Sequence, residues 1–188
     1  MSSQYKFEEH SEEIKSQSKV RLTDLLSRIN EEKKIERVLH RTGSWQVAEL
    51  EWTMISQGVT DTSLLQGVIS GSETNAGTFF FDKDGTGNYA ITYNQIPKNG
   101  FFRWSINNSG TVSIIETTSL INSIINTTLS WLNEDYSVFQ EAYSFAINQT
   151  GEKIFTGDGG GGLQILNAGG TFVGQYGVVF DYIKLVEN

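Results

Sequence analysis

Two closely spaced carboxylates, Glu49 and Glu51, have the residue type and spacing for acid–base chemistry. Side chains two residues apart on a β-strand share a face, and a carboxylate pair on a β scaffold can act on glycans. No opposing carboxylate is identified. Two solvent-facing glutamates that alternate with Leu50 and Trp52 explain the same spacing and are the favoured interpretation. A carboxylate with a raised pKa in a cleft would support catalysis, whereas full exposure of both would remove that hypothesis.

Two residue types that often serve as nucleophile, general base or zinc ligand, cysteine and histidine, are missing from most of the chain. Cysteine is absent, and both histidines, His10 and His40, precede Gly43. Residues 43–188 therefore cannot hold a Ser-His-Asp triad, a Cys-His dyad or a His-ligated zinc ion. The sequence predicts a protein that is not an enzyme.

Two short motifs imitate known binding loops. Asp82, Asp84 and Gly87 match part of an EF-hand loop, but Tyr93 occupies the place of the bidentate glutamate, so a hairpin turn is predicted. Residues 157–162 formally match the dinucleotide-binding pattern, yet no helix pattern follows them. We expect a flexible loop there, at a barrel mouth. Neither a cofactor nor a metal is indicated.

Charge is divided unevenly along the 188 residues. Residues 1–42 hold nine Lys or Arg and eight Asp or Glu, whereas residues 43–188 hold five and fourteen. Because an acidic domain repels phosphates and anionic headgroups, we expect neither nucleic acid nor a membrane surface as its partner. No segment approaches the roughly 20 apolar residues of a membrane-spanning helix, and the N-terminus lacks a signal-peptide pattern. A soluble chain is expected.

An amphipathic helix is predicted within residues 1–42, after a polar tail over residues 1–13 that we expect to be frayed. Its apolar residues follow helical spacing in two groups, with an interruption near Asn30. We expect this narrow stripe to pack across the β domain or one end of it. Docking of a protein partner is the second interpretation, because the step between the groups breaks the heptad. The groups are Leu22, Leu25, Leu26 and Ile29, then Ile35, Val38 and Leu39.

Residues 43–188 alternate strand patterns with turn signals. Eight to ten short strands with short connections predict a barrel or a sandwich. Residues 56–76 are expected to form a long loop, and residues 118–126 fit either a short helix or a loop. The candidate strands are residues 44–55, 78–81, 87–93, 102–106, 112–114, 127–132, 136–147, 152–156, 163–167 and 171–186.

Three features give the chain a family resemblance: Gly43-x-Trp45 entering the first strand, the hairpin over residues 79–87, and Phe102-Arg103-Trp104 followed by the strand at 112–114. With them the chain resembles the lipocalin-like proteins of the calycin group, particularly small envelope domains of Bacteroidetes-type bacteria. The resemblance implies an antiparallel up-and-down β-barrel with an N-terminal α-helix. It also implies a calyx for a small apolar or amphiphilic ligand, and a periplasmic or envelope location once a leader or lipid anchor has been removed.

The resemblance also implies a closed barrel end where Trp45 packs beneath a basic residue of the last strand, here Lys184. Arg103, flanked by Phe102 and Trp104, should point away from both, either to a surface salt bridge or to a ligand anion. Aromatic residues predicted to face inward or line the mouth are Trp52, Phe79, Phe81, Tyr89, Phe102, Trp104 and Trp131, with Phe145, Phe155, Phe172 and Phe180.

Two functions are therefore left open. In the first, the barrel is a non-catalytic carrier for a small ligand. In the second, its interior is filled by side chains, and the helix or exposed hairpins contact a protein partner. A large apolar cavity would favour the first, and a filled interior with an exposed apolar patch would favour the second.

Overall fold

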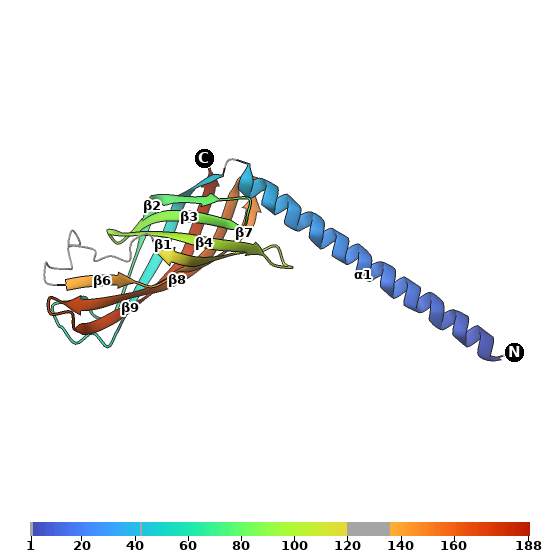
Figure 1. Cartoon of the computed structure of the whole chain (residues 1–188), viewed down its shortest axis with the longest axis horizontal. Helices are drawn as coiled ribbons and strands as arrows, with labels where there is room; N and C mark the ends of the chain where they lie inside the picture. The colour runs from blue at the N-terminus through green and yellow to red at the C-terminus, as the bar shows by residue number, and fades with distance from the viewer. Residues whose placement is uncertain (1, 42, 120–135) are drawn as a thin grey trace.

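The computed structural model describes residues 2–41, 43–119 and 136–188 and confirms a mainly β fold with one N-terminal helix (Figure 1). Helix α1 spans Ser2–His40. All nine strands of these residues belong to one antiparallel sheet. They are β1 (Ser44–Gln57), β2 (Val68–Phe81), β3 (Thr86–Tyr93), β4 (Ile96–Ile106), β5 (Val112–Ser119), β6 (Tyr136–Gln140), β7 (Ser144–Gly151), β8 (Ile154–Asn167) and β9 (Phe172–Glu187).

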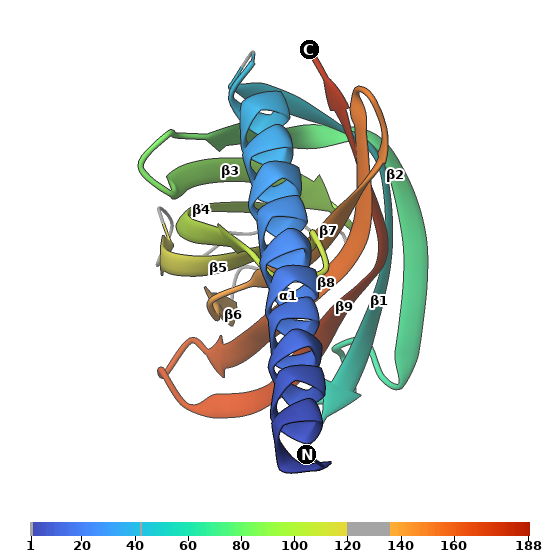
Figure 2. The ribbon, with the colours of Figure 1, turned by 90° about the vertical axis from the view of Figure 1, so that its right-hand side faces the viewer.

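The sheet closes into a ring because β9 pairs with both β1 and β8. Strands β6 and β7 run in succession along β8, β6 against its second half and β7 against its first. The two therefore occupy the place of one interrupted strand, and the barrel has an up-and-down order. Figure 2 shows the strands curving around behind α1. Closure joins the first and last strands of the ring; among the described strands, unpaired edges remain only locally, for example along β6 and along residues 68–76 of β2.

Alternation of side chains along each strand sets the barrel interior. In β3, for example, Tyr89, Ile91 and Tyr93 are buried, whereas Ala90 and Thr92 are exposed. Successive side chains of a strand point to opposite faces, so a two-residue repeat of large residues fills one side of the wall. The same repeat in the other strands produces one continuous core.

Strand β4 is longer than the sequence pattern predicts. It begins at Ile96 rather than at residue 102, directly after a two-residue turn formed by Asn94 and Gln95. Both turn residues have positive φ, 44° and 64°, as a type I′ hairpin turn requires. Pro97 and Gly100, residue types that are depleted in strands, lie inside β4 and conceal its start.

The predicted long loop over residues 56–76 is wrong in its second half. β2 begins at Val68, so the loop covers only residues 58–67. Gly71 pairs with Trp52, and the Trp52 ring lies where a Cβ at Gly71 would be. The polar, glycine-containing strand is therefore held by pairing and by an aromatic ring from β1. Of the ambiguous segment, Thr118 and Ser119 end β5; residues 120–126 and the candidate strand 127–132 lie outside the described residues.

The predicted flexible loop at residues 157–162 is also wrong. These residues form the middle of β8, where residues 157–160 pair with β7 and residues 157 and 159–162 pair with β9. Large side chains occupy the space that Cβ atoms would fill: a Cβ at Gly159 would meet the Phe145 ring, and one at Gly161 would overlap the Tyr143 ring. The glycines serve close packing inside a strand, so the patterns at 152–156 and 163–167 belong to one strand.

Helix α1 is continuous through Asn30, so the predicted interruption does not occur, and its backbone is helical from Ser2, within the segment predicted to be a polar tail. Glu and Lys, which dominate residues 31–34, are good helix formers. As expected for packing on one end of the barrel, contact is confined to its last turns, where Ile35 is 3% exposed and Leu39 fully buried. The rest of α1 projects away from the barrel (Figure 1).

Several polar contacts fix α1 to the barrel. The Trp45 indole donates to the Leu39 carbonyl over 3.1 Å, and the Arg41 guanidinium donates to Glu187 at the end of β9, with Nε 2.7 Å from Oε1. The His40 ring lies 5.3 Å from that of Trp104. The hydrogen bond between these two side chains lowers the pKa of the Glu187 carboxyl and raises the pKa of the Arg41 guanidinium.

Substitution of Gly161 by alanine tests the packing role of the β8 glycines. The added Cβ overlaps the Tyr143 ring, and overpacking of this kind lowers the free energy of unfolding by about 1–3 kcal/mol. Denaturant unfolding measures the change. Gly169→Ala is the matched control: its Cβ would lie 3.4 Å from the nearest atom, so a change within about 0.5 kcal/mol is expected. Equal effects of both substitutions would contradict the packing role.

Candidate functional site

The barrel interior contains an ion pair between Lys98 of β4 and Glu116 of β5. Lys98 Nζ donates to Glu116 Oε1 over 2.8 Å and to the Glu141 carbonyl over 3.0 Å. The side chain of Lys98 is fully buried and that of Glu116 is 1% exposed. A charge inside a protein is tolerated only when it is paired and hydrogen-bonded. This pair meets that condition and ties two neighbouring strands to the backbone that follows β6.

Three tyrosines surround the ion pair. Tyr89 donates its hydroxyl to Glu116 Oε2 over 2.8 Å, and the Tyr143 amide donates to the same oxygen over 2.6 Å. The hydroxyls of Tyr93 and Tyr143 are 2.5 Å apart. Lys98 Nζ also lies 4.5 Å from the centre of the Tyr143 ring, a cation–π geometry. Glu116 thus accepts three hydrogen bonds and organises the interruption between β6 and β7.

Burial governs the titration of this cluster. It lowers the pKa of Lys98, because desolvation disfavours the ammonium, although Glu116 opposes the shift. Burial likewise raises the pKa of Tyr89, Tyr93 and Tyr143, so the phenols stay neutral and act as donors. A buried lysine can be a nucleophile, but Lys98 is enclosed by its partners and reaches no solvent.

The aromatic residues predicted to line a calyx are buried against one another. Phe79 lies 5.1 Å from Tyr89 and 5.9 Å from Phe102, measured between ring centres. Phe145 meets Phe79 edge-on at 5.2 Å and stacks on Phe180 at 5.5 Å. These rings join strands on opposite sides of the barrel, so they form a packed column through its interior.

Other predicted residues lie at the ends of the barrel. At the α1 end, Phe81 and Trp104 pack together, and the Trp104 indole donates to the Asp82 and Thr86 carbonyls. Trp52 is buried in the other half beside Tyr93, with ring centres 6.3 Å apart.

Two of the predicted aromatics are not placed in the interior. Phe172, at the start of β9, is 53% exposed, so it does not face inward. Trp131 lies outside the described residues.

The predicted charged residues lie on the outer surface. Arg103 is exposed between the buried side chains of Phe102 and Trp104, as the strand pattern predicts. Lys184 donates to Glu49 over 2.6 Å, whereas Trp45, fully buried, packs edge-on against Phe155. Lys184 alternates with inward-facing neighbours, so it stands on the opposite face of the wall from Trp45. Helix α1, through the Leu39 carbonyl, takes the place that the resemblance gives to a basic residue.

Glu49 and Glu51 are both exposed on the outer face of β1. The Glu49 carboxylate is engaged by Lys184, and its strand neighbours Leu50 and Trp52 point inward. The alternation expected for two solvent-facing glutamates is therefore present. The desolvated cleft on which the acid–base hypothesis depends is not found at this pair.

The loop over residues 58–67 covers the barrel end opposite α1. Leu64 is buried in the core, and the Tyr176 hydroxyl donates to the Leu65 carbonyl over 2.7 Å. Asp61 accepts hydrogen bonds from Tyr136 Oη and from the amide and hydroxyl of Ser63. These bonds, the one from Tyr136 first, lower the pKa of the Asp61 carboxyl. The loop is thus latched to β6 by one carboxylate.

Two buried polar atoms of the described residues lack a hydrogen-bond partner, namely Trp52 Nε1 and Gln140 Oε1. Gln140 does use its amide nitrogen, which donates to the Pro97 carbonyl over 2.7 Å. Trp52 Nε1 is a donor and Gln140 Oε1 an acceptor, and both lie in the half of the barrel that holds the ion pair. A buried unpaired polar group usually has a water or a ligand as its partner.

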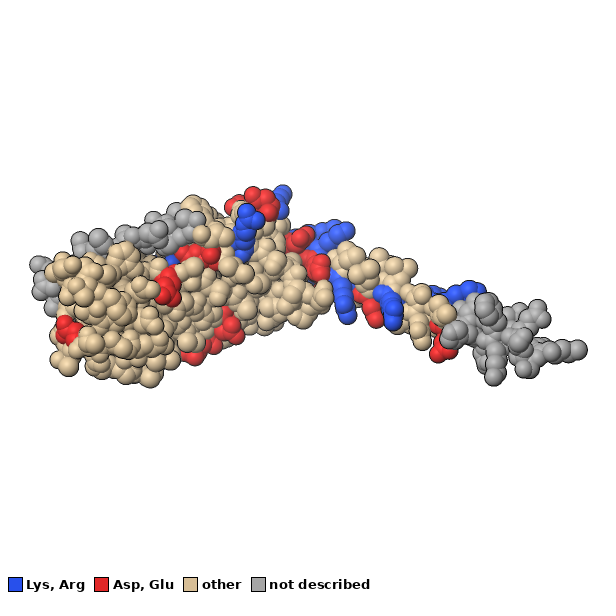
Figure 3. All heavy atoms as spheres, turned by 60° about the horizontal axis from the view of Figure 1, so that its bottom comes forward, with Lys and Arg blue, Asp and Glu red and all other residues tan. Residues whose placement is uncertain are grey.

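The projecting part of α1 carries exposed leucines. Leu22, Leu25 and Leu26 are 56%, 53% and 52% exposed, and Ile29 is half-buried. Figure 3 shows basic and acidic side chains along α1, with scattered acidic side chains on the visible face of the barrel. Across the described residues no helix, α1 included, is apolar enough over the required length to cross a membrane. Leu22, Leu25 and Leu26 form a narrow apolar stripe on a helix whose other exposed side chains are mostly polar or charged.

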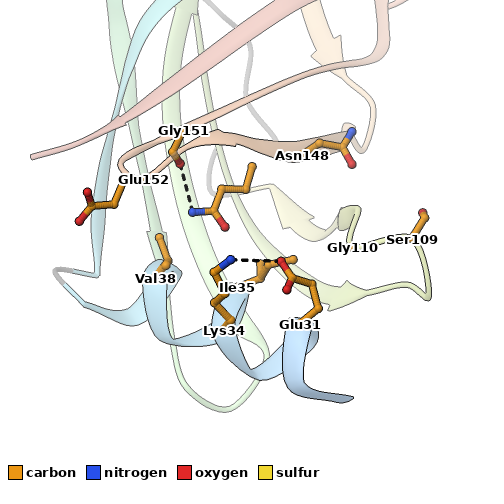
Figure 4. Close-up of a pocket in the computed structure, with 10 residues that line it drawn as sticks. Glu31, Lys34, Ile35, Val38, Ser109, Gly110, Asn148, Gly151 and Glu152 are labelled. Atoms are coloured by element: carbon orange, nitrogen blue, oxygen red, sulfur yellow. Dashed lines mark hydrogen bonds and ion pairs between the residues drawn. The ribbon is translucent and has the colours of Figure 1, made fainter. Parts of the chain in front are cut away.

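A groove lies where α1 meets the barrel (Figure 4). It measures about 510 Å³ and is lined on the helix by Glu31, Lys34, Ile35 and Val38, opposite the β4–β5 and β7–β8 turns. Lys34 pairs with Glu31 over 3.5 Å at its edge. The groove is open to solvent, and Ile35 and Val38 contribute to its lining beside charged and polar side chains.

The sequence does carry a signal for Lys98 and Glu116, namely their even spacing from apolar residues on the same strand. Lys98 stands four residues before Phe102 and two after Ile96, and Glu116 stands two after Ile114. In a strand these intervals place each charge on the inward face. Neither charge was predicted to lie inside, because the predicted strands began after Lys98, at residue 102, and ended before Glu116, at residue 114. Tyr143 and Asp61 carry no comparable local signal, since both act through strands distant in sequence.

Comparison with known proteins gives no match to a family model, to a curated protein or to a solved structure. The lipocalin-like resemblance therefore stays a prediction, and function must be argued from this chain alone.

Breaking the interior ion pair should be strongly destabilising. Glu116→Gln leaves the buried Lys98 ammonium without its carboxylate, so the free energy of unfolding should fall by about 3–5 kcal/mol. Chemical denaturation measures it. The double variant Lys98→Met, Glu116→Leu removes both charges and should recover most of the loss. Additive losses in the double variant would contradict a coupled pair.

The Asp61 latch predicts a pH dependence for the loop over residues 58–67. Since the folded pKa of Asp61 is lowered, its stabilisation is complete above the ordinary carboxyl value of 3.8 and is lost as the pH falls through the folded pKa. Asp61→Asn should reproduce that loss at pH 7, as faster amide exchange in the loop. Asp158→Asn, on the exposed surface of β8, is the control. Unchanged exchange in Asp61→Asn would contradict the latch.

Proposed function

We propose that this chain is a non-catalytic interaction protein that docks a partner through α1. The observation that carries the proposal is the exposure of Leu22, Leu25 and Leu26 on a helix that projects from the barrel. Burying a leucine contributes about 1.5–3 kcal/mol, so a partner that covered these side chains would gain substantially. In proteins most of the stability of a helix comes from packing of its apolar face, and a partner would supply that packing to the projecting part of α1.

The barrel suits the role of a rigid base. Its interior aromatic rings pack against one another across the ring of strands. At the junction, Leu39 is fully buried, and the ion pair of Arg41 with Glu187 joins the end of α1 to the last strand. These contacts support a helix held in a fixed direction, which reduces the entropy lost when a partner binds.

Binding of a small apolar or amphiphilic ligand is a second candidate. It is favoured by the unpaired Trp52 Nε1 and Gln140 Oε1 in the buried half of the barrel, because a ligand with one donor and one acceptor would satisfy both. An envelope location, implied by the lipocalin-like resemblance, belongs with this candidate. Thermal shift across a panel of fatty acids and other amphiphiles tests it. A shift that Trp52→Phe abolishes would support it.

Substitutions on α1 should separate docking from folding. Leu25→Ser removes an exposed side chain, so the free energy of unfolding should change by less than about 0.5 kcal/mol. Leu39→Ser, at the buried end of the same helix, should cost about 2–5 kcal/mol. Denaturant unfolding of the full chain measures both. A large loss for Leu25→Ser would mean that this face is already covered by the protein itself.

A photo-crosslinking amino acid placed on α1 in cells of the source organism tests docking directly. Incorporation at Leu26 should yield a discrete crosslinked product, and incorporation at Thr23, on another face, should not. Leu22→Ser with Leu25→Ser should abolish the product while the barrel stays folded. Identical products from both positions, or none from either, would contradict a docking face on α1.

A further inference from the structure

We propose that the partner of α1 is an acidic amphipathic helix, an inference that rests on the docking function proposed above. It follows from the arrangement of charge beside the exposed leucines. A partner helix would lay its apolar seam along that of α1 and place Asp or Glu against the basic rows on both sides.

The exposed apolar line has the geometry of a helix–helix seam. Leu22, Leu25 and Ile29 are spaced by three and four residues, as a, d and a positions of a heptad. The same register reaches Leu39, which is two heptads after Leu25 and is fully buried on the barrel. The seam therefore continues an established interface outward along the same helix. Glu32 and Glu36 occupy the positions between, so they mark where the apolar docking stretch ends.

Basic residues flank the seam on both sides. In this register Lys19 and Lys33 hold e positions, and Arg21 and Arg28 hold g positions. The fifth such position between residues 19 and 33 is Leu26. These residues are all exposed. Residues at e and g select the partner through charge, so the complementary helix carries carboxylates there.

Of the acidic residues between positions 19 and 33, Glu32 lies on the seam, where the apolar stretch ends, and the other two lie away from it. Asp24 and Glu31 both hold c positions, outside the rows that a partner would face. The helix is nearly neutral as a whole, yet the face beside the leucines is basic. A partner reads this local pattern because surface charges are screened beyond about 8–10 Å.

A second copy of the chain fits this face poorly. In an in-register parallel pair each g residue faces the following e of the other helix, so Arg28 would meet Lys33; in an antiparallel pair g faces g and e faces e, so the arginines at g would meet one another. An anionic membrane fits less well than a helix, since the seam is one or two residues wide and interfacial helices bury a broad apolar face. Both remain as outcomes of the test.

The test uses the full chain and two designed peptides of four heptads, each with Leu at a and d. One carries Glu at every e and g position and the other Lys. Fluorescence anisotropy should show the Glu peptide binding at least tenfold more tightly than the Lys peptide, with a preference that shrinks at high salt. Arg21→Glu with Arg28→Glu leaves two basic and two acidic positions beside the seam, so it should abolish the preference. Lys34→Glu with Arg37→Glu reverses two charges off the seam and is the matched control.

The remaining outcomes decide against the acidic helix. Equal binding of both peptides, or of neither, would overturn it, as would concentration-dependent dimerisation in analytical ultracentrifugation or binding to phosphatidylglycerol vesicles through the seam. The docking function itself is judged by the crosslink at Leu26. If that crosslink persists and depends on Leu22 and Leu25 while the charge reversals have no effect, docking stands and only the partner class fails.

Discussion

The fold depends on the close packing of large side chains against the bare backbone of β8. Without Cβ atoms at Gly159 and Gly161, the rings of Phe145 and Tyr143 lie directly on the strand, and β8 pairs with β7 on one side and with β9 on the other. Those two pairings close the ring. Closure in turn determines which residues become interior, because every inward-facing position of a closed barrel is enclosed.

Because the interior is enclosed, a charged side chain inside it needs a partner there. Lys98 and Glu116 are inside and satisfied by one another, by Tyr89 and by backbone groups. Among the described residues most other charged side chains face solvent, although that of Glu187 is 3% exposed and pairs with Arg41. The exposed leucines of α1 lie beyond the barrel. The interior packing thus determines the fold, whereas exposed large apolar side chains lie both on α1 and on the outer wall of the barrel, for example Phe101 and Ile115. Those of α1 are the ones that stand on a projecting element, and they carry the docking function that we propose.

Sequence patterns were sufficient for the elements with regular repeats and failed where tertiary contacts override local preference. The helix, the two central hairpins and the inward aromatics could be predicted, since each depends on spacing within one segment. The strand status of residues 157–162 could not, because glycine is a strand former only when neighbouring strands supply the packing. For the same reason the partnership of Lys98 with Glu116 needed the register of β4 against β5, which sequence alone does not provide.

Native mass spectrometry of the gently purified full chain, with solvent extraction of any small molecule, tests the central claim most directly. If the interior belongs to the chain's own side chains and the protein acts through α1, the spectrum shows the bare 21.0 kDa chain and the extract is empty. A stoichiometric apolar or amphiphilic adduct would contradict the account and return the barrel to the role of a carrier.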